Sequence, residues 1–471
     1  MKKNYLLLAL LIAAAILAKG QSNMLTLEGC IETALKNNVT VKQRELQAKA
    51  AGIGYKQAKD NLLPSAQSTF NYGINNGRTI DPFTNSYLTQ QLKSSSADAS
   101  ASIPLFNGFQ LRNTIKQNEQ AFAGATMEWQ QRKDELALQV ILAYLQVLST
   151  QDAAELAKQQ AGVTKQQVDR IEIVGKEGAT LPSNVTDLKG QYAGDQINLV
   201  NAENNYQSSL LALTQLMQVP YDEQLQCSRT GLTEDVQQFA SVPGEIYALA
   251  LQKLSVVKAA DFRVNSSVMA VKAARGALYP SLSFYGGAST NYSSAATLNS
   301  FVSSADLPTG AYVQYNGSNL PVLAKQDTYK SSPISYASQF SNNISYGFGL
   351  SMRIPLFNSF RVRNAIRLAK NDEQNNRLIA DYIKIQLRQN IDQAYININA
   401  AYKRYQALQE QAAAYTESYR IVSLRFENGV INSPEYLIAK NNMDRANANL
   451  IIANYECMLR KKILEFYMGS L

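Results

Sequence analysis

The longest regular pattern of apolar positions in the chain is a seven-residue repeat near its C-terminus. Its first set of positions is Ile391, Ile398, Tyr405, Ala412, Tyr419 and Phe426, and its second set is Ala394, Ala401, Leu408, Tyr415 and Val422. A repeat of seven places both sets on one side of a helix and is typical of a left-handed coiled coil. An ordinary helix with one buried stripe would show part of this pattern, but no proline interrupts residues 356–433. We therefore predict one long coiled-coil helix over residues 356–428.

The same pattern occurs in the N-terminal half with smaller residues. Its two sets are Val140, Val147, Ala154, Ala161, Val168 and Ala143, Thr150, Ala157, Thr164, Ile171. They predict a second long helix over residues 105–177. Gly178 or Gly429 and then Pro182 or Pro434 follow the two long helices. Since glycine ends helices and proline begins them, we expect returning helices over 183–218 and 434–467, so that each long helix ends in a helical hairpin.

A duplicated motif shows that the two halves are tandem repeats. The segments Ile103-Pro-Leu-Phe-Asn-Gly-Phe-Gln-Leu-Arg-Asn-Thr-Ile115 and Ile354-Pro-Leu-Phe-Asn-Ser-Phe-Arg-Val-Arg-Asn-Ala-Ile366 share nine of thirteen residues. We predict repeat 1 over residues 21–240 and repeat 2 over 241–471. Each repeat is expected to hold a helix pair (26–62 or 244–278) and a β-hairpin (64–104 or 281–355) before its long and returning helices. A connector to residue 240 completes repeat 1.

The β-hairpins are predicted from apolar residues at every second position. Ile344, Tyr346, Phe348, Leu350, Met352 and Ile354 alternate with small or polar residues, and the first repeat has a weaker version. A soluble hairpin would alternate too, but the length suits the ~9–11 residues of a tilted strand that crosses a bilayer. Four strands per chain cannot close a barrel, and open strand edges are not tolerated in lipid. Several chains must then share one barrel. Two copies would make eight strands with a filled interior, and three would make twelve and leave room for a lumen.

The second β-hairpin carries an insertion between Tyr292 and Phe340 that is rich in Ser, Asn, Gly and Tyr. It joins two strands at the end away from the long helices. We therefore expect an extracellular loop, where long insertions are tolerated.

The N-terminus has the features of a secretory signal peptide, which we assign to residues 1–20. Lys2 and Lys3 precede an apolar run that is too short to span a bilayer, and Ala18-Lys19-Gly20 fits a cleavage site. Cys30 is either a lipidation site or, as its preceding glutamate favours, a cysteine on the first amphipathic helix. The three cysteines are widely spaced and predict neither a disulfide framework nor a metal cluster.

Composition argues against an enzyme. The sequence contains no histidine, which removes the commonest general base and metal ligand. It shows no phosphate-binding loop and no nucleophile elbow, so we expect no catalytic residues, cofactor or bound metal. Its net charge of +8, part of which belongs to the expected signal peptide, is not a nucleic-acid-binding signature.

The order of these parts resembles the TolC family of outer-membrane efflux ducts. The resemblance is carried by the duplicated Ile-Pro-Leu-Phe-Asn-x-Phe motif, by Leu25-Thr-Leu-Glu-Gly-Cys-Ile-Glu-Thr-Ala-Leu-Lys-Asn-Asn38, and by Arg425-Phe-Glu-Asn-Gly429. It implies a fold that is mainly α with a membrane β-barrel. A homotrimer would form a twelve-stranded barrel in the outer membrane, continued by a barrel of twelve helices through the periplasm. Such ducts are passive and dock an inner-membrane transporter through a periplasmic adaptor protein. The cargo, which can be drugs, metals, siderophores or proteins, stays open.

The resemblance also assigns roles to residues of the helical hairpins. Gly178 and Gly429, with Arg425, would lie in the contact with the adaptor. Glu435, six residues after Gly429, would line the constriction of the periplasmic entrance, although Ile438 stands where related ducts often have a second acid. Asp187 is a looser match in repeat 1. A solvated carboxylate is the alternative for both acids.

Two other classes share long coiled coils, namely periplasmic adaptors and trimeric surface adhesins without transport activity. An adaptor would need a lipoyl-like domain and a soluble β-barrel between its helices, and no segment predicts them. An adhesin would not need two helical hairpin ends. The sequence therefore favours an outer-membrane channel of an efflux or secretion system.

Overall fold

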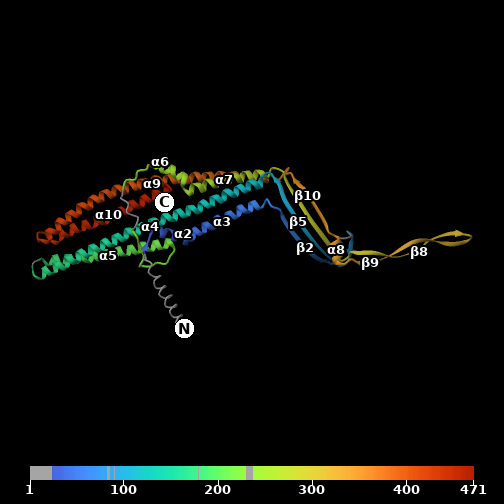
Figure 1. Cartoon of the computed structure of the whole chain (residues 1–471), viewed down its shortest axis with the longest axis horizontal. Coiled ribbons are helices and arrows are strands. Elements are labelled where there is room, and N and C mark those ends of the chain that lie inside the picture. The colour runs from blue at the N-terminus through green and yellow to red at the C-terminus, as the bar shows by residue number, and fades with distance from the viewer. Residues whose placement is uncertain (1–23, 82–84, 90, 179, 230–236, 471) are drawn as a thin grey trace, which may run out of the picture. The chain divides into compact units, whose positions relative to one another are not determined.

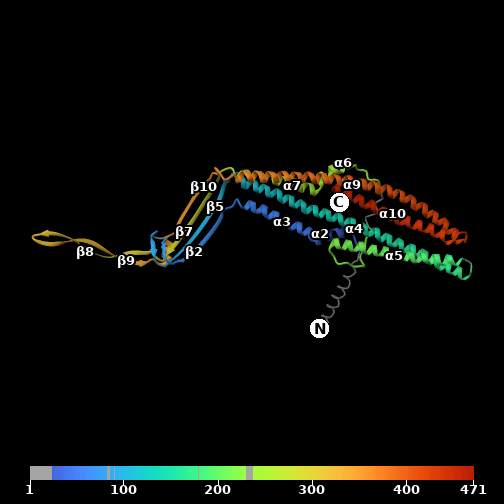
Figure 2. The same ribbon diagram turned by 180° about the vertical axis from the view of Figure 1, so that it is seen from behind.

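The computed structural model describes residues 24–81, 85–89, 91–178, 180–229 and 237–470 (Figure 1). The expected signal peptide lies outside these residues. The chain divides into two compact units, each built from both repeats. The helical unit comprises residues up to 53, 118–267 and 372–471, and the sheet unit comprises 54–117 and 268–371. The order of elements in each repeat can be followed in Figure 1 and from behind in Figure 2.

The helices follow the predicted order in both repeats. They are α2 (Leu27–Asn37), α3 (Val39–Asp60), α4 (Gln110–Lys176) and α5 (Pro182–Met217) in repeat 1, and α6 (Pro243–Lys253), α7 (Ser255–Gly276), α9 (Arg361–Glu427) and α10 (Ser433–Tyr467) in repeat 2. The long helices α4 and α9 have 67 residues each. Every position of both seven-residue repeats is buried or half-buried. None of the helices in the described part of the chain is long and apolar enough to cross a membrane.

Cys30 lies on α2 and is fully buried in a core with Leu136, Tyr144 and Leu213. This position fits the helix cysteine rather than a lipidated one. Burial and the nearby Glu28 raise the pKa of its thiol to about 12. All three cysteines are free and buried.

The predicted starts of the long helices, at residues 105 and 356, are wrong by five residues. The helices begin at Gln110 and Arg361 because two successive residues with positive φ precede each of them. These pairs are Gly108 and Phe109 (φ 64° and 62°) and Ser359 and Phe360 (φ 53° and 58°). A left-handed pair cannot belong to a helix. The duplicated motif therefore encodes a turn between strand and helix rather than the first helical turn.

Four strands of the sheet unit form one antiparallel sheet in the order β10-β7-β5-β2. They are β2 (Ser65–Asn75), β5 (Leu92–Asn107), β7 (Ser281–Ser293) and β10 (Ser345–Arg353). Phe348, Leu350 and Met352 lie on one face and are 62–79% exposed. The pairing register places Phe284, Ile103 and Phe70 on the same face, while small and polar residues such as Ser100 and Gly349 occupy the other. The sheet thus has one apolar and one polar face, as the alternation predicts.

The insertion in repeat 2 is not an irregular loop. It forms a two-stranded antiparallel ribbon, β8 (Thr297–Tyr315) and β9 (Ser318–Pro333), followed by the short helix α8 (Tyr336–Asn342). Figures 1 and 2 both show the ribbon leaving the end of the four-stranded sheet, and Figure 1 labels α8 at this end. The Ser, Asn, Gly and Tyr content of this segment and its position between two strands suggested a loop. Its alternation of apolar and polar residues, together with Asn316-Gly317 at a tight turn, is the hairpin signal that composition concealed. Four shorter strands form two small sheets in the described part of the chain. β1 (Met24–Leu25) pairs with β6 (Gln226–Cys227), and β3 (Arg78–Ile80) pairs with β4 (Tyr87–Thr89).

Gly108 makes a close backbone contact that explains why glycine stands there. A Cβ atom at this position would lie 2.2 Å from the carbonyl oxygen of Gly276 at the end of α7. The equivalent residue in repeat 2 is Ser359, which has a similar φ. Positive φ alone therefore does not require a glycine in this turn. Position 108 requires one because a side chain there would clash with the backbone of Gly276.

We predict that Gly108→Ala lowers the free energy of unfolding by at least about 2 kcal/mol, because it adds a clash to a left-handed conformation. Ser359→Ala is the matched control and should change it by less than about 1 kcal/mol. Thermal unfolding of the detergent-extracted protein, followed by circular dichroism, measures both. Equal melting temperatures for the two variants would show that the contact with Gly276 does not matter.

Candidate functional site

Each helical hairpin turns through a glycine at its tip. We call residues 177–181 the first tip and residues 428–432 the second tip. Gly178 has φ 73° and Gly429 has φ 69°. A Cβ atom at either position would meet nothing within 4 Å, so the backbone conformation and not the space explains these glycines. The amide of Gly429 donates to the carbonyl of Phe426, and that of Val430 donates to Arg425, which satisfies two carbonyls at the end of α9.

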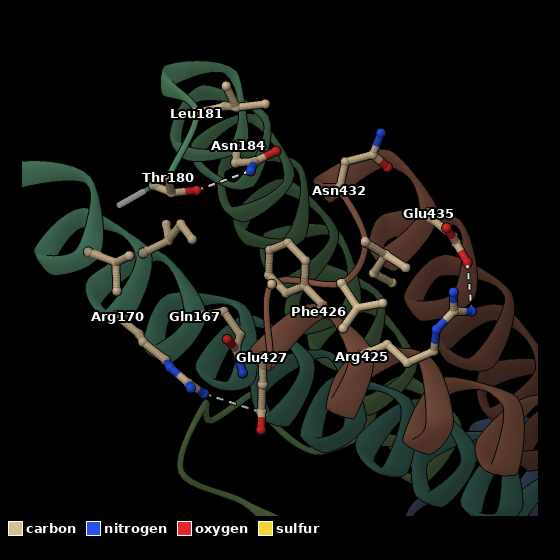
Figure 3. A pocket seen from close by; sticks show the side chains of 15 residues that line it. Gln167, Arg170, Thr180, Leu181, Asn184, Arg425, Phe426, Glu427, Asn432 and Glu435 are labelled. Atoms are coloured by element: carbon tan, nitrogen blue, oxygen red, sulfur yellow. Dashed lines mark hydrogen bonds and ion pairs between the residues drawn. The ribbon is translucent and has the colours of Figure 1, made fainter. Parts of the chain in front are cut away.

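A cavity of about 790 Å³ lies between the two tips (Figure 3). Predicted site residues Arg425, Gly429 and Glu435 line it, together with Thr180, Leu181 and Asn184 of the first tip region and apolar residues of the second. Gly178 and Asp187 are not among its lining residues.

Two ion pairs border this cavity. The guanidinium of Arg425 lies 3.3 Å from the carboxylate of Glu435, and both side chains are 50% exposed. Arg170 of α4 lies 3.4 Å from Glu427 of α9 and so joins the two repeats (Figure 3). Since exposed pairs contribute about 0–1 kcal/mol each, they set the local charge more than the stability.

Asp187 has a different environment from Glu435. One of its carboxylate oxygens accepts a hydrogen bond of 2.7 Å from the hydroxyl of Ser433, the first residue of α10. The backbone amide of Ser433 donates to Asn184 in addition. Asp187 therefore joins the start of α10 to α5, and a carboxylate at a helix N-terminus is favourable.

An apolar cluster lies next to the tips, between the four hairpin helices. Val168, Leu188, Phe426 and Tyr436 are buried together, one from each of the four hairpin helices. The rings of Phe426 and Tyr436 stack with centroids 4.7 Å apart, and the hydroxyls of Tyr419 and Tyr436 are 3.0 Å apart. The second tip is thus held by aromatic packing as well as by its turn.

Deeper between the hairpins lies a buried ionic cluster that the sequence did not predict. The ammonium group of Lys440 on α10, whose side chain is 1% exposed, lies 2.9 Å from the carboxylate of Asp195 on α5 and also contacts Asp444. Thr164 of α4 and Gln191 donate hydrogen bonds to Asp195. Three hairpin helices therefore meet at one lysine.

The charges in this cluster depend on each other. Burial raises the pKa of the Asp444 carboxyl, and Lys440 only partly offsets this effect. Burial by itself would lower the pKa of Lys440, but hydrogen bonds and attraction from Asp444 and Asp195 raise it overall. The sequence shows Lys440 and Asp444 only as an ordinary i,i+4 pair on a helix. Burial depends on how α10 packs on α5, which no local pattern reveals.

Paired helical hairpins with glycine turns, together with a sheet that has one apolar face, define an outer-membrane channel protein of the efflux type. The family model described as outer membrane efflux protein matches residues 30–218 and 246–470. The chain belongs to this family. It is therefore an outer-membrane efflux channel that extends into the periplasm, and its family transports rather than catalyses.

Solved structures show the same fold at low sequence identity. The channel CusC matches with a TM-score of 0.75 and 15% identity over 94% of this chain and 92% of that one. The CmeC outer membrane channel of Campylobacter jejuni has a TM-score of 0.73 and 15% identity, covering 94% and 85% of the two chains. The open state of MtrE from Neisseria gonorrhoeae has a TM-score of 0.72 and 17% identity, covering 94% and 89%. No curated protein sequence matches the chain.

We predict that Lys440→Met lowers the free energy of unfolding by about 3–5 kcal/mol, because it leaves two buried carboxylates without their cation. Burial already raises the pKa of the Asp444 carboxyl, and loss of the lysine removes the interaction that partly offsets this effect, so its pKa rises further above the unfolded value. The folded protein then binds more protons than the unfolded chain, and its stability increases as pH falls. Thermal unfolding of the extracted protein as a function of pH measures the effect.

Lys189→Met is the matched control. Lys189 is also a lysine of the hairpins, 2.7 Å from Glu172, but its side chain is 54% exposed. Its replacement should cost less than about 1 kcal/mol and show no such pH dependence. A similar melting temperature for both variants would contradict a role of the buried cluster in holding the hairpins together.

Proposed function

We propose that three copies of the chain form one channel, with a twelve-stranded β-barrel in the outer membrane and a tunnel of twelve helices in the periplasm. The observation that carries this proposal is the four-stranded sheet. It has an exposed apolar face, a face of small and polar residues, and two unpaired edges, β2 and β10. Lipid would cover the first face, and a water-filled lumen would suit the second.

The strand order supports closure by identical chains. Neighbouring strands alternate in direction along β10-β7-β5-β2, so β2 of one chain would meet β10 of the next in the antiparallel sense. Every edge in the ring would then be paired, as the absence of water in a bilayer requires. Three copies would leave a lumen, whereas two would make a barrel filled with side chains.

The hairpin tips are the proposed docking site for a periplasmic adaptor protein, which would connect the channel to an inner-membrane transporter. The tips expose several apolar side chains. Leu181 and Val430, which line the cavity between the tips, are 63% and 65% exposed, and Ile438 in the second turn of α10 is 64% exposed. Gly178, Arg425 and Gly429 would lie in this contact, as the family resemblance implies. An exposed apolar patch with a polar border is a feature of protein interaction sites.

Glu435 and Asp187 have different expected roles at the periplasmic entrance. The carboxylate of Glu435 is half exposed and pairs with Arg425, which is also half exposed. Three copies of it around one axis would attract cations into a narrow entrance. Asp187 is hydrogen-bonded to Ser433, which favours a role in joining the two hairpins of one chain over a role in the pore.

The trimer is tested by the mass of the detergent-extracted complex. We expect three chains per particle, because only a closed ring pairs both edges of each sheet. Native mass spectrometry or light scattering corrected for detergent provides the measurement. A stable monomer in the outer membrane would contradict the proposal.

The entrance is tested by two substitutions with opposite expected effects. Glu435→Gln removes a negative charge and should lower the ratio of cation to anion permeability, whereas Arg425→Gln leaves Glu435 unpaired and should raise it. Both effects should weaken at high salt. Single-channel recordings in planar bilayers at low salt measure the ratio.

Glu427→Gln is the control for this pair of variants. Its carboxylate lies in a comparable ion pair at the same tip, with Arg170, and its side chain is 35% exposed. If all three variants keep the wild-type ratio, Glu435 does not face the permeation path.

A further inference from the structure

The β8–β9 ribbon is firmly attached at its base. The side-chain amide of Gln339, which is 1% exposed, donates to the carbonyls of Ser293 and Ile334 at the two ends of the ribbon. The hydroxyl of Ser293 donates in turn to the buried Asp81. The amide of Ile334 donates to the carbonyl of Ala296. These hydrogen bonds join the base of the ribbon to the end of β7 and to α8.

Charge divides the ribbon into two parts. All four of its charged residues, Asp306, Lys325, Asp327 and Lys330, lie in the part near the sheet, which we call the stem (297–306 and 325–333). The far part, Leu307–Ala324, contains no charged residue, and we call it the head. A ribbon that stays in water would normally carry charged residues along its whole length. The uncharged head is therefore suited to contact with another protein surface.

Both faces of the head are apolar. Neighbouring cross-strand pairs point to opposite faces of a ribbon. Tyr312 pairs with Pro321 on one face, and Val313 pairs with Leu320 on the other. Tyr312, Val313 and Leu320 are 50–63% exposed in the single chain. A head with two apolar faces needs a partner on each face, which a single flat protein surface cannot provide.

The edges of the head are poorly suited to strand pairing. Pro308 and Pro321 lack amide hydrogens, and the register of the head is broken between Pro308 and Tyr312. Prolines and bulges are devices that keep edge strands from pairing. Lipid is also a poor environment for the head, because the unpaired backbone groups of an open ribbon would be buried in hydrocarbon. The head is therefore expected to contact its partners through its two apolar faces.

We propose that the three heads of one trimer pack face against face around the threefold axis and form a cap over the outer end of the channel. This inference rests on the trimer of the proposed function. In a closed ring of three, each head has two neighbours, so one covers each apolar face. The heads carry no charge that would make identical copies repel each other.

The ribbon is long enough to reach the axis. A twelve-stranded barrel with strands about 4.8 Å apart and tilted by about 40° has a radius of roughly 12 Å. The 19 residues of β8 span roughly 60 Å when extended. The heads can therefore meet at the axis beyond the barrel, with the stems surrounded by water.

Cysteine crosslinking tests the cap. The three natural cysteines are buried, so cysteines introduced on the ribbon are the reactive ones. Tyr312 and Leu320 lie on opposite faces of the head and only one residue apart along the ribbon, because Tyr312 pairs with Pro321. In Tyr312→Cys/Leu320→Cys, each face of one head meets the other face of the next at nearly the same height, so mild oxidation should join most chains into covalent trimers. Either single variant has one reactive cysteine per chain and cannot yield more than a covalent dimer.

The matched control is Ser304→Cys/Thr328→Cys, which places cysteines on opposite faces of the stem and one residue apart along the ribbon, because Ser304 pairs with Asp327. It should remain mostly uncrosslinked under the same conditions. The mass of each extracted variant is measured before oxidation. If the trimer forms but the head pair crosslinks no more than the stem pair, the cap is wrong and the trimer stands. If no trimer forms, the proposed function itself fails. A fluorophore on Val313→Cys that is quenched by lipid-borne quenchers in vesicles would overturn the cap in favour of a membrane contact.

Discussion

Unpaired backbone groups along β2 and β10 are the constraint on which the rest of this molecule depends. The apolar face of this sheet is exposed in the single chain, and the chain belongs to a family of outer-membrane proteins. In lipid, each unsatisfied amide or carbonyl costs several kcal/mol. The sheet unit can therefore not be complete as one chain. This requirement gives meaning to features that otherwise look unrelated, namely the exposed aromatic residues of β10, the serines and glycines on its other face, and the even number of strands in each chain.

Regular patterns that continue over many residues were sufficient to predict most of the fold. The seven-residue repeats located α4 and α9, and the alternation around Phe348 located β10, because each pattern reports directly which side of an element is buried. The boundaries at Gln110 and Arg361 could not be found in this way. They depend on the φ angles of Phe109 and Phe360, and a phenylalanine gives no indication in the sequence that it will adopt a left-handed conformation. The β8–β9 ribbon was missed for the opposite reason, because its composition resembles a loop although its alternation does not.

The candidate site also contains residues that the sequence could predict and residues that it could not. Gly178 and Gly429 could be predicted, since helix ends need residues that accept positive φ. Arg425, Glu435 and Asp187 were assigned only through the resemblance to a family, and the structure places Asp187 against Ser433 rather than beside the cavity. Lys440 was not found at all. Its burial arises where α5 and α10, which are far apart in the sequence, pack together, and such a contact is a property of the tertiary fold.

The two halves of the chain have ceased to be copies of each other. The first half has Gly108, packed against Gly276, where the second half has Ser359. In the described part of the chain only the second half carries the ribbon, and only in the second half does an arginine stand four residues before the tip glycine. Three such chains in a ring would present six hairpins of two alternating kinds. The ring would then have threefold symmetry where six separate half-chains would have had sixfold symmetry. Because the two halves are fused in one chain, the two kinds of hairpin can differ in sequence and in role. One kind can bind a partner while the other kind moves.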